Sequence, residues 1–258
     1  MTTGKLAVVL GGGNGIGAAC ATLMAERGWR LAVADLQESA AKEVAARIGG
    51  QGFGVDISDP HALEVLAETV EQALGPVDAL VVCAAMFQER YAPEDLPLDV
   101  FRKIMAVNVE GTFVANTVFG TRMAARGSGS IVNIASVNAH VSSPTHAYGP
   151  SKAAVLNITR NLAAQWGRSG VRVNSISPGN VLVERMLARP PGRYATNLEN
   201  YMALGRRIQP AEIAEGVEFL ASDKASAVTG SDLLMDAGLF AANGWAAYGG
   251  VPPAANST

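Results

Sequence analysis

Short apolar runs recur along this chain, and segments of helical periodicity separate them. The runs are candidate strands at Leu6–Leu10, Arg30–Ala34, Gly52–Val55, Ala79–Val82, Ser130–Ala135, Val171–Ile176 and Leu233–Met235. They are continuously apolar rather than alternating, which is typical of parallel strands buried on both faces. Segments such as Ala18–Arg27, Pro60–Leu74 and Tyr148–Trp166 have the length of crossover helices. This order predicts a doubly wound, Rossmann-type α/β fold, a parallel sheet of about seven strands with helices on both faces.

The length of 258 residues suits one α/β domain, and no linker or internal repeat divides the chain. Residues 1–258 are therefore predicted to form a single domain. Residues 182–207 are rich in Arg, Pro and Gly, and so long a connection usually closes over a ligand. The alternative for this substrate-covering segment is an ordinary surface loop. The tail from Gly249 to Thr258 is predicted to be a mobile end.

The net charge and the cysteines limit the classes of partner and site that we expect. The net charge is -3 and no Lys/Arg run occurs, so the electrostatic footprint of a nucleic-acid or membrane partner is missing. Cys20 and Cys83 lack metal-type spacing, which favours buried thiols over a disulfide or a metal site. Neither a signal peptide nor an apolar stretch of about 20 residues occurs, so we expect a cytoplasmic protein with small-molecule partners.

A glycine-rich stretch follows the first apolar run and opens a helical pattern at Ala18. It reads Gly11, Gly12, Gly13, Asn14, Gly15, Ile16 and Gly17. Glycines at such a turn let backbone amides and a helix N-terminus approach a pyrophosphate. Any strand-to-helix turn can contain glycines, but the position between the first strand and a helix predicts a dinucleotide site.

Two aspartates follow the next candidate strands. Asp35 lies 18 residues beyond Gly17, where a carboxylate can accept hydrogen bonds from the ribose hydroxyls of adenosine. Because no Arg or Lys follows it, Asp35 favours NAD over NADP. It could also cap the following helix. Asp56 could hydrogen-bond an adenine amino group or form a turn with its neighbours.

Tyr148 and Lys152 share one face of a predicted helix. A nearby ammonium favours the phenolate form of a tyrosine, which makes that side chain an acid/base near neutral pH. The same spacing also occurs by chance in an anchored aromatic beside a solvated lysine. Ser136 ends the fifth candidate strand, at the edge where such a sheet places its ligands. Asn108 interrupts a helical pattern in which asparagine has a mediocre propensity.

Together these motifs resemble the short-chain dehydrogenase/reductase family, in its single-domain form, over nearly the whole chain. The resemblance rests on the glycine loop, Asp35, Asn108, Ser136, Tyr148-x-x-x-Lys152, Pro178-Gly179 and the ending from Val228 to Gly238. It implies that Tyr148 is the general acid/base, Ser136 polarises the substrate oxygen, Lys152 holds the nicotinamide ribose and Asn108 organises a water. It assigns cofactor binding to Gly11, Asn14, Gly15, Ile16, Gly17, Asp35, Asp56, Ile57, Ala84, Tyr148, Lys152, Pro178, Gly179 and Val181.

The chain departs from the family pattern at several positions. Leu10 replaces the threonine that braces the glycine turn, and Val183 replaces a threonine that touches the carboxamide. Cys83 lies in Val82–Ala85, where the family has Asn-Asn-Ala-Gly, so side-chain bonds that steady the sheet are lost or replaced. Ile208 stands where a glycine is expected. We expect a modest effect of Leu10, a lower stability from the change at Val82–Ala85, and nicotinamide positioning that relies on backbone groups at Val183. The change at Ile208 has no interpretation from the sequence.

The predicted activity is NAD-dependent interconversion of a secondary alcohol, namely a polyol, sugar or cyclic alcohol, and its ketone. Polar residues near the site favour a hydroxylated substrate, although most of them could face water; they are Asn138, His140, His146, Glu184, Arg185, Arg189 and Arg193. Reduction of a 3-oxoacyl thioester is the rival within the class, and a non-catalytic NAD-sensing protein is the rival outside it. The resemblance also implies a homotetramer, in which Trp245 and Tyr248 could reach a neighbouring subunit.

Overall fold

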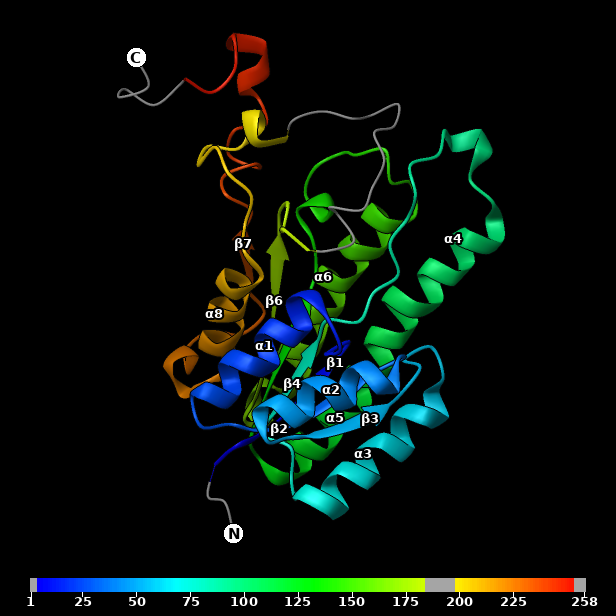
Figure 1. The fold of residues 1–258 in the computed structure, drawn as a ribbon, viewed down its shortest axis with the longest axis vertical. Coiled ribbons are helices and arrows are strands. Elements are labelled where there is room, and N and C mark those ends of the chain that lie inside the picture. Colours follow the sequence, from blue (N-terminus) through cyan, green and yellow to red (C-terminus); the bar gives the residue numbers. More distant parts are fainter. Residues whose placement is uncertain (1–3, 184–197, 253–258) are drawn as a thin grey trace.

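A computed structural model describes residues 4–183 and 198–252 of the chain. Its centre is a seven-stranded parallel sheet with the order β3-β2-β1-β4-β5-β6-β7 (Figure 1). The strands are β1 Leu6–Leu10, β2 Arg30–Asp35, β3 Gln51–Gly54, β4 Ala79–Val82, β5 Gly129–Ile134, β6 Val171–Pro178 and β7 Asp232–Met235. The predicted fold is confirmed, and each predicted strand end lies within two residues of the observed one.

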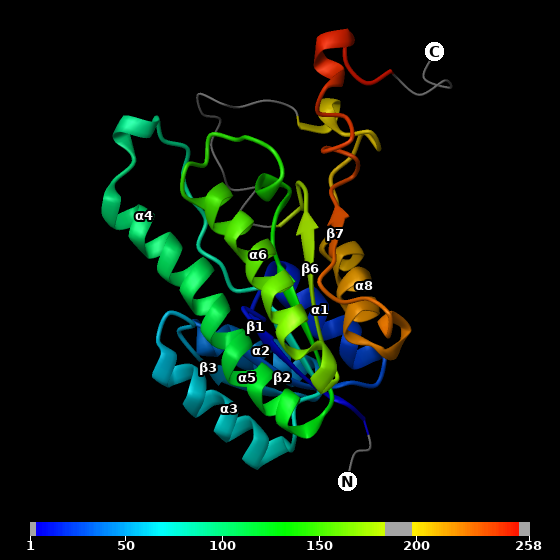
Figure 2. The same cartoon turned by 180° about the vertical axis from the view of Figure 1, so that it is seen from behind.

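Helices cover both faces of the sheet, as the two opposite views show (Figures 1 and 2). One face carries α1 Gly15–Glu26, α2 Glu38–Ile48 and α8 Pro210–Ala221, and the other carries α3 Pro60–Leu74, α5 Thr112–Arg126 and α6 Tyr148–Trp166. Helix α4 Leu98–Met105 continues through the π-helical turn η2 Ala106–Gly111 into α5. Short 3-10 turns are η1 Pro93–Asp95, η3 Val137–Ala139, η4 Gly167–Ser169, η5 Leu198–Tyr201, η6 Asp223–Ala225 and η7 Trp245–Tyr248. No helix in the described ranges is long and apolar enough to cross a membrane.

The side chains of β1 explain why the apolar runs are continuous. Ala7 and Val9 pack into the core on the side of α1, α2 and α8, whereas Leu6, Val8 and Leu10 pack into the core on the opposite side. Successive strand residues point to opposite faces, so a strand covered on both faces needs an apolar residue at every position. All five side chains are 1% exposed or less.

A buried polar network ties β5 to two helices where the family pattern had led us to expect lost sheet contacts. The Asn116 and Asn133 side chains exchange hydrogen bonds of 2.8 and 3.0 Å, and Asn133 Nδ2 also donates to Thr159 Oγ1. Both asparagines are fully buried. Buried polar groups stabilise a fold only when they are satisfied. These bonds connect α5, β5 and α6 without the asparagines that Val82 and Cys83 replace.

The order of the strands determines which strand ends can bind a ligand. The chain leaves β1 toward β2 and β3 on one side and later returns to fill β4 through β7 on the other. The carboxyl ends of β1 and β4 therefore form the switch point at which this architecture binds ligands. Helix α1 is assigned from Gly15 and not from Ala18, and Asn14 before it has the extended backbone of an N-cap. Gly15 itself has a φ of +54°, so the regular helix follows it.

Candidate active site

The glycine loop makes a compact turn at the carboxyl end of β1. Gly11 has a φ of +75°, and the amides of Gly11 and Gly12 donate to the carbonyl oxygen of Ala34 at 2.8 and 3.0 Å. A Cβ at Gly17 would lie 2.1 Å from the Gly11 carbonyl oxygen, so only glycine allows α1 to start this close to the turn. The N-terminus of α1, with its amides not used by the helix, thus lies beside the loop. These features fit a dinucleotide pyrophosphate.

The Asp35 carboxylate at the end of β2 is bound to this loop. Its Oδ2 accepts from the Gly13 amide at 2.9 Å and its Oδ1 from the Gln37 amide at 3.0 Å. The residue that caps α2 is Gln37, so Asp35 supports the turn before that helix without being its cap. A carboxylate has about four acceptor positions, and these two bonds leave capacity for ribose hydroxyls.

The structure favours the turn interpretation of Asp56. Its Oδ1 accepts from the amide and the hydroxyl of Ser58 at 2.9 and 2.7 Å. Ile57 is buried, and a Cβ on Gly111 would lie 2.7 Å from its carbonyl oxygen. The adenine contact of Asp56 stays a prediction. The Ala84 amide donates to Leu10 O at 3.0 Å and so joins the ends of β4 and β1.

The segment after β6 explains two departures from the family pattern. Ile208 is buried and pairs with Val181 in a short parallel bridge, in which the Leu182 amide donates to Ile208 O at 2.8 Å. A branched apolar residue therefore fills this position. Val183 reaches the glycine loop, since a Cβ on Gly15 would lie 3.4 Å from Val183 Cγ1.

Pro178 ends β6, and Gly179 follows it against β7. The Gly179 amide donates to Met235 O, and a Cβ there would lie 2.7 Å from Asp236 Cα. Glycine is therefore required for this close approach. The turn lies at the carboxyl end of β6, on the same edge of the parallel sheet as the glycine loop.

Tyr148 and Lys152 lie together at the start of α6, as their spacing predicts. Lys152 Nζ is 5.8 Å from the centre of the Tyr148 ring and donates to Ile134 O at 2.6 Å. Both residues are buried, at 7% and 2% exposure. The pair therefore lies away from bulk water, where charges interact more strongly than at the surface. The Phe87 ring stacks on the Tyr148 ring with centroids 4.8 Å apart.

Ser136 and Asn108 approach the same helix by different routes. Ser136 is buried just after β5, where its Oγ accepts from the Asn138 amide at 3.2 Å. Asn108 lies in the π-helical turn, a feature that often marks functional sites. Its Nδ2 donates to Ser151 Oγ at 3.0 Å, and that hydroxyl donates to Tyr148 O at 2.7 Å.

The structure describes three of the seven polar residues that the sequence predicts near the substrate. Asn138 Nδ2 donates to Thr145 Oγ1 at 3.4 Å, which keeps a polar wall beside Ser136. His146 is exposed. His140 Nε2 lies 2.8 Å from Asp232 Oδ2 and 3.2 Å from Ser177 Oγ, so this histidine is engaged with β6 and β7. Four predicted lining residues lie outside the described ranges; they are Glu184, Arg185, Arg189 and Arg193.

Sequence reasoning missed Phe87 and Gln88, which both contact Tyr148. The Gln88 Oε1 accepts from the amides of Ala147 and Tyr148 at 2.6 and 3.0 Å. These residues follow β4 in a stretch without periodicity, and no local pattern marks them. Asn108 holds the same stretch, since its side chain bonds to both the amide and the carbonyl of Met86, at 2.7 and 3.0 Å.

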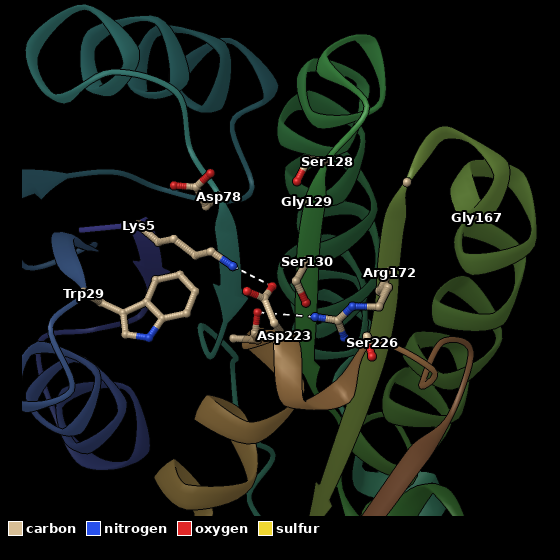
Figure 3. A pocket seen from close by; sticks show the side chains of 12 residues that line it. Lys5, Trp29, Asp78, Ser128, Gly129, Ser130, Gly167, Arg172, Asp223 and Ser226 are labelled. Atoms are coloured by element: carbon tan, nitrogen blue, oxygen red, sulfur yellow. Dashed lines mark hydrogen bonds and ion pairs between the residues drawn. The ribbon is translucent and has the colours of Figure 1, made fainter. Parts of the chain in front are cut away.

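A cavity of about 300 Å³ lies at the opposite, amino edge of the sheet (Figure 3). Lys5 Nζ is paired there with Asp223 at 2.6 Å. The Arg172 guanidinium donates to Leu220 O and Ser222 O at 2.7 and 2.9 Å, and so caps the end of α8. Burial lowers the pKa of Arg172. None of the predicted site residues lines this cavity, so its charges serve the fold.

Comparisons with known proteins show which family the chain resembles. Residues 11–240 match the family model described as Enoyl-(Acyl carrier protein) reductase. The chain is 40% identical over 242 residues to a D-threitol dehydrogenase of Mycolicibacterium smegmatis, covering 91% of this chain and 92% of the relative. It is 35% identical over 240 residues to an NAD-dependent glycerol dehydrogenase of Listeria innocua, covering 92% and 94%.

Its structure also resembles a crystal structure named as the ribose-5-phosphate isomerase of Brucella melitensis 16M. The TM-score is 0.92 at 41% identity, with 97% of this chain and 98% of that chain covered.

Proposed function

The chain belongs to the short-chain dehydrogenase/reductase family, and we propose that it interconverts a polyol or sugar and its ketone with NAD. It is an oxidoreductase of secondary alcohols. The observation that carries the catalytic assignment is the buried pair of Tyr148 and Lys152 at the start of α6, with Nζ 5.8 Å from the ring centre.

The proposed chemistry assigns a separate role to each side chain. NAD, when bound, supplies the acceptor for the hydride that leaves the substrate carbon. Tyr148, as phenolate, takes the hydroxyl proton of the alcohol on its Oη. Lys152 favours that phenolate through its charge, and Ser136 Oγ donates a hydrogen bond to the substrate oxygen. The backbone of Asn108 holds a water through which the proton reaches solvent.

The preference for NAD rests on charge. The N-terminus of α1 beside the glycine loop, the Asp35 carboxylate and the β6 end would hold the cofactor. The extra phosphate of NADP would face the Asp35 carboxylate, and Leu36 and Gln37 supply no cation to neutralise it. The similarity to an NAD-dependent glycerol dehydrogenase supports the same choice.

The polyol assignment has two supports. The relatives named above act on D-threitol and glycerol. Asn138, Ser143 and Thr145 form a chain of polar side chains next to Ser136, with 2.6 Å between the two hydroxyls of Ser143 and Thr145. Such partly buried polar groups pair with substrate hydroxyls, and an apolar substrate offers them no such bonds. Cyclic alcohols remain within the proposed class.

We also propose a homotetramer in the cytoplasm. Helices α4 and α5 and the turn between them border an apolar groove of about 450 Å³, which includes Met105, Val109 and Phe113. Phe113 is 48% exposed, and exposed apolar patches of this kind mark interfaces. Trp245 is 48% exposed in the carboxyl-terminal region and supplies a second apolar contact. Cys20 and Cys83 are free thiols, in keeping with a reducing compartment.

One assay tests the activity and its rivals together. Reduced nicotinamide is followed by absorbance with NAD or NADP over D-threitol, glycerol, a cyclic diol and a 3-oxoacyl thioester. Ribose 5-phosphate is added without cofactor, because an aldose–ketose conversion tests the activity in the name of the Brucella structure. We expect turnover with NAD on the polyols, and its loss in Tyr148→Phe with NAD binding retained.

Other outcomes identify the rivals. Turnover confined to the thioester with NADPH contradicts the polyol proposal and supports the acyl reductase. NAD binding without turnover on any substrate class supports the NAD-sensing protein. An active Tyr148→Phe variant contradicts the assignment of the general acid/base.

A further inference from the structure

Helix α6 begins in a dry environment that leaves two backbone amides without water. The first amides of a helix have no acceptor within it. Ala147 is fully buried and Tyr148 is 7% exposed, so solvent cannot serve these two groups. Position 147 is the N-cap, where Ser, Thr, Asp or Asn usually supplies a side-chain acceptor, and alanine has none to give.

Gln88 fills this role from a distant part of the chain. Its Oε1 accepts from the amides of Ala147 and Tyr148 at 2.6 and 3.0 Å, across 59 and 60 residues of sequence. The Gln88 side chain is buried, at 2% exposure. The Oε1 atom of Gln88 thus accepts hydrogen bonds from both amides at the start of α6, the helix that carries Tyr148.

The neighbours of Gln88 hold it at a defined position. Phe87 stacks on the Tyr148 ring at an interplanar angle of 25°. Met86 is bound through both its amide and its carbonyl by the side chain of Asn108. The stretch from Met86 to Gln88 therefore contacts Tyr148 at its backbone and at its ring.

We propose that Gln88 is a positioning residue for Tyr148: its amide oxygen fixes the first turn of α6 and thereby places the phenol for proton transfer. The inference rests on the proposed function, since it needs Tyr148 to be the acid/base. Tyr148 is the first residue of the helix, so a change in that turn moves its Oη directly. Proton transfer and hydride transfer depend steeply on geometry, and a displacement of about 1 Å costs about 100-fold in rate.

The decisive variants keep or remove the acceptor. Gln88→Met preserves length without an acceptor, whereas Gln88→Glu preserves the acceptor oxygen. Gln88→Asn keeps a polar side chain, but it is one methylene shorter and so withdraws the acceptor oxygen from the two amides. The matched structural control is Arg172→Met, which removes a cap from α8 at the opposite edge of the sheet. NAD binding and cooperative unfolding verify that each variant is folded.

We expect Gln88→Met and Gln88→Asn to lower kcat by about 10- to 100-fold, with the KM for NAD within about twofold of wild type. Gln88→Glu, measured on the plateau of its pH profile, should keep kcat within about threefold even where its stability is lower. Arg172→Met should lower stability and leave kcat unchanged.

The proposal is overturned if Gln88→Met and Gln88→Asn keep the wild-type kcat, or if Gln88→Glu loses as much as they do. It is also overturned if Arg172→Met lowers kcat equally, because the effect then follows stability alone. Tyr148→Phe separates this failure from that of the proposed function. Activity in Tyr148→Phe removes the acid/base assignment, whereas its inactivity beside a fully active Gln88→Met removes only the positioning role.

Discussion

Gly17 allows α1 to lie close to the glycine turn. The Gly17→Ala variant therefore tests whether this close approach positions the cofactor. A Cβ at this position would lie 2.1 Å from the Gly11 carbonyl oxygen and 2.8 Å from its carbon. Carbon–oxygen contacts need about 3.3 Å, so the new methyl group must move α1 away from the turn by about 1 Å. The contact is with backbone, which cannot turn aside as a flexible side chain can.

Two consequences follow from this displacement. Overpacking of this kind lowers the free energy of unfolding by about 1–3 kcal/mol. The amides at the start of α1 also move relative to the pyrophosphate, and losing one good contact there, about 1.4 kcal/mol, raises the Kd for NAD about tenfold. We therefore expect Gly17→Ala to lose both stability and NAD affinity.

The assay is a titration of wild type and Gly17→Ala with NAD, together with urea unfolding of both. Gly167→Ala is the matched control, because Gly167 has a φ of -55° and a Cβ there would meet nothing within 4 Å. It should bind NAD and unfold as the wild type does. If Gly17→Ala binds NAD with unchanged affinity, the close approach of α1 does not position the cofactor and the reasoning is wrong.

Three further variants test the cofactor preference, the acid stability and the proposed assembly. Asp35→Asn removes the charge that opposes the extra phosphate of NADP, so the ratio of Kd values for NADP and NAD should fall at least about tenfold; an unchanged ratio would show that Asp35 does not discriminate. Glu212 has its pKa lowered from 4.5 to about 2, first by Arg206 and then by the Gln209 amide, so its stabilisation is complete above about pH 4.5 and is lost as the pH falls toward 2. Glu212→Gln should therefore flatten the loss of stability over that range in urea unfolding, and equal slopes would contradict this. Phe113→Glu places a charge in the apolar groove and should give a smaller species in sedimentation, whereas an intact tetramer would place the interface elsewhere.

The fold was predictable because the physical signal was repeated along the chain. A strand covered on both faces must be apolar at each position, and the β1 residues divide between two cores as that rule requires. The start of α1 was not predicted, because glycine has a low helix propensity and Gly15 to Gly17 therefore suggest a loop. Gly17 can lie in the helix there because it has no Cβ to meet the Gly11 carbonyl, which is a tertiary effect.

The position of a candidate site residue was predictable where a strand end or a helix face determines it. Asp35 and Tyr148 are of this kind, since the strand and helix patterns place them. The partners of His140 follow from no such pattern, because Ser177 and Asp232 lie 37 and 92 residues away on other strands.

Gln88 shows why local capping rules reach their limit at this site. Those rules find an acceptor among the residues next to a helix start, and Ala147 offers none. At the N-cap position itself, the sequence of α6 therefore supplies no side-chain acceptor. The structure supplies the acceptor from the stretch after β4, which Asn108 holds through Met86. The start of the helix that carries Tyr148 thus bonds to a residue 60 positions earlier, so under the proposed positioning role a change in the stretch after β4 reaches the phenol.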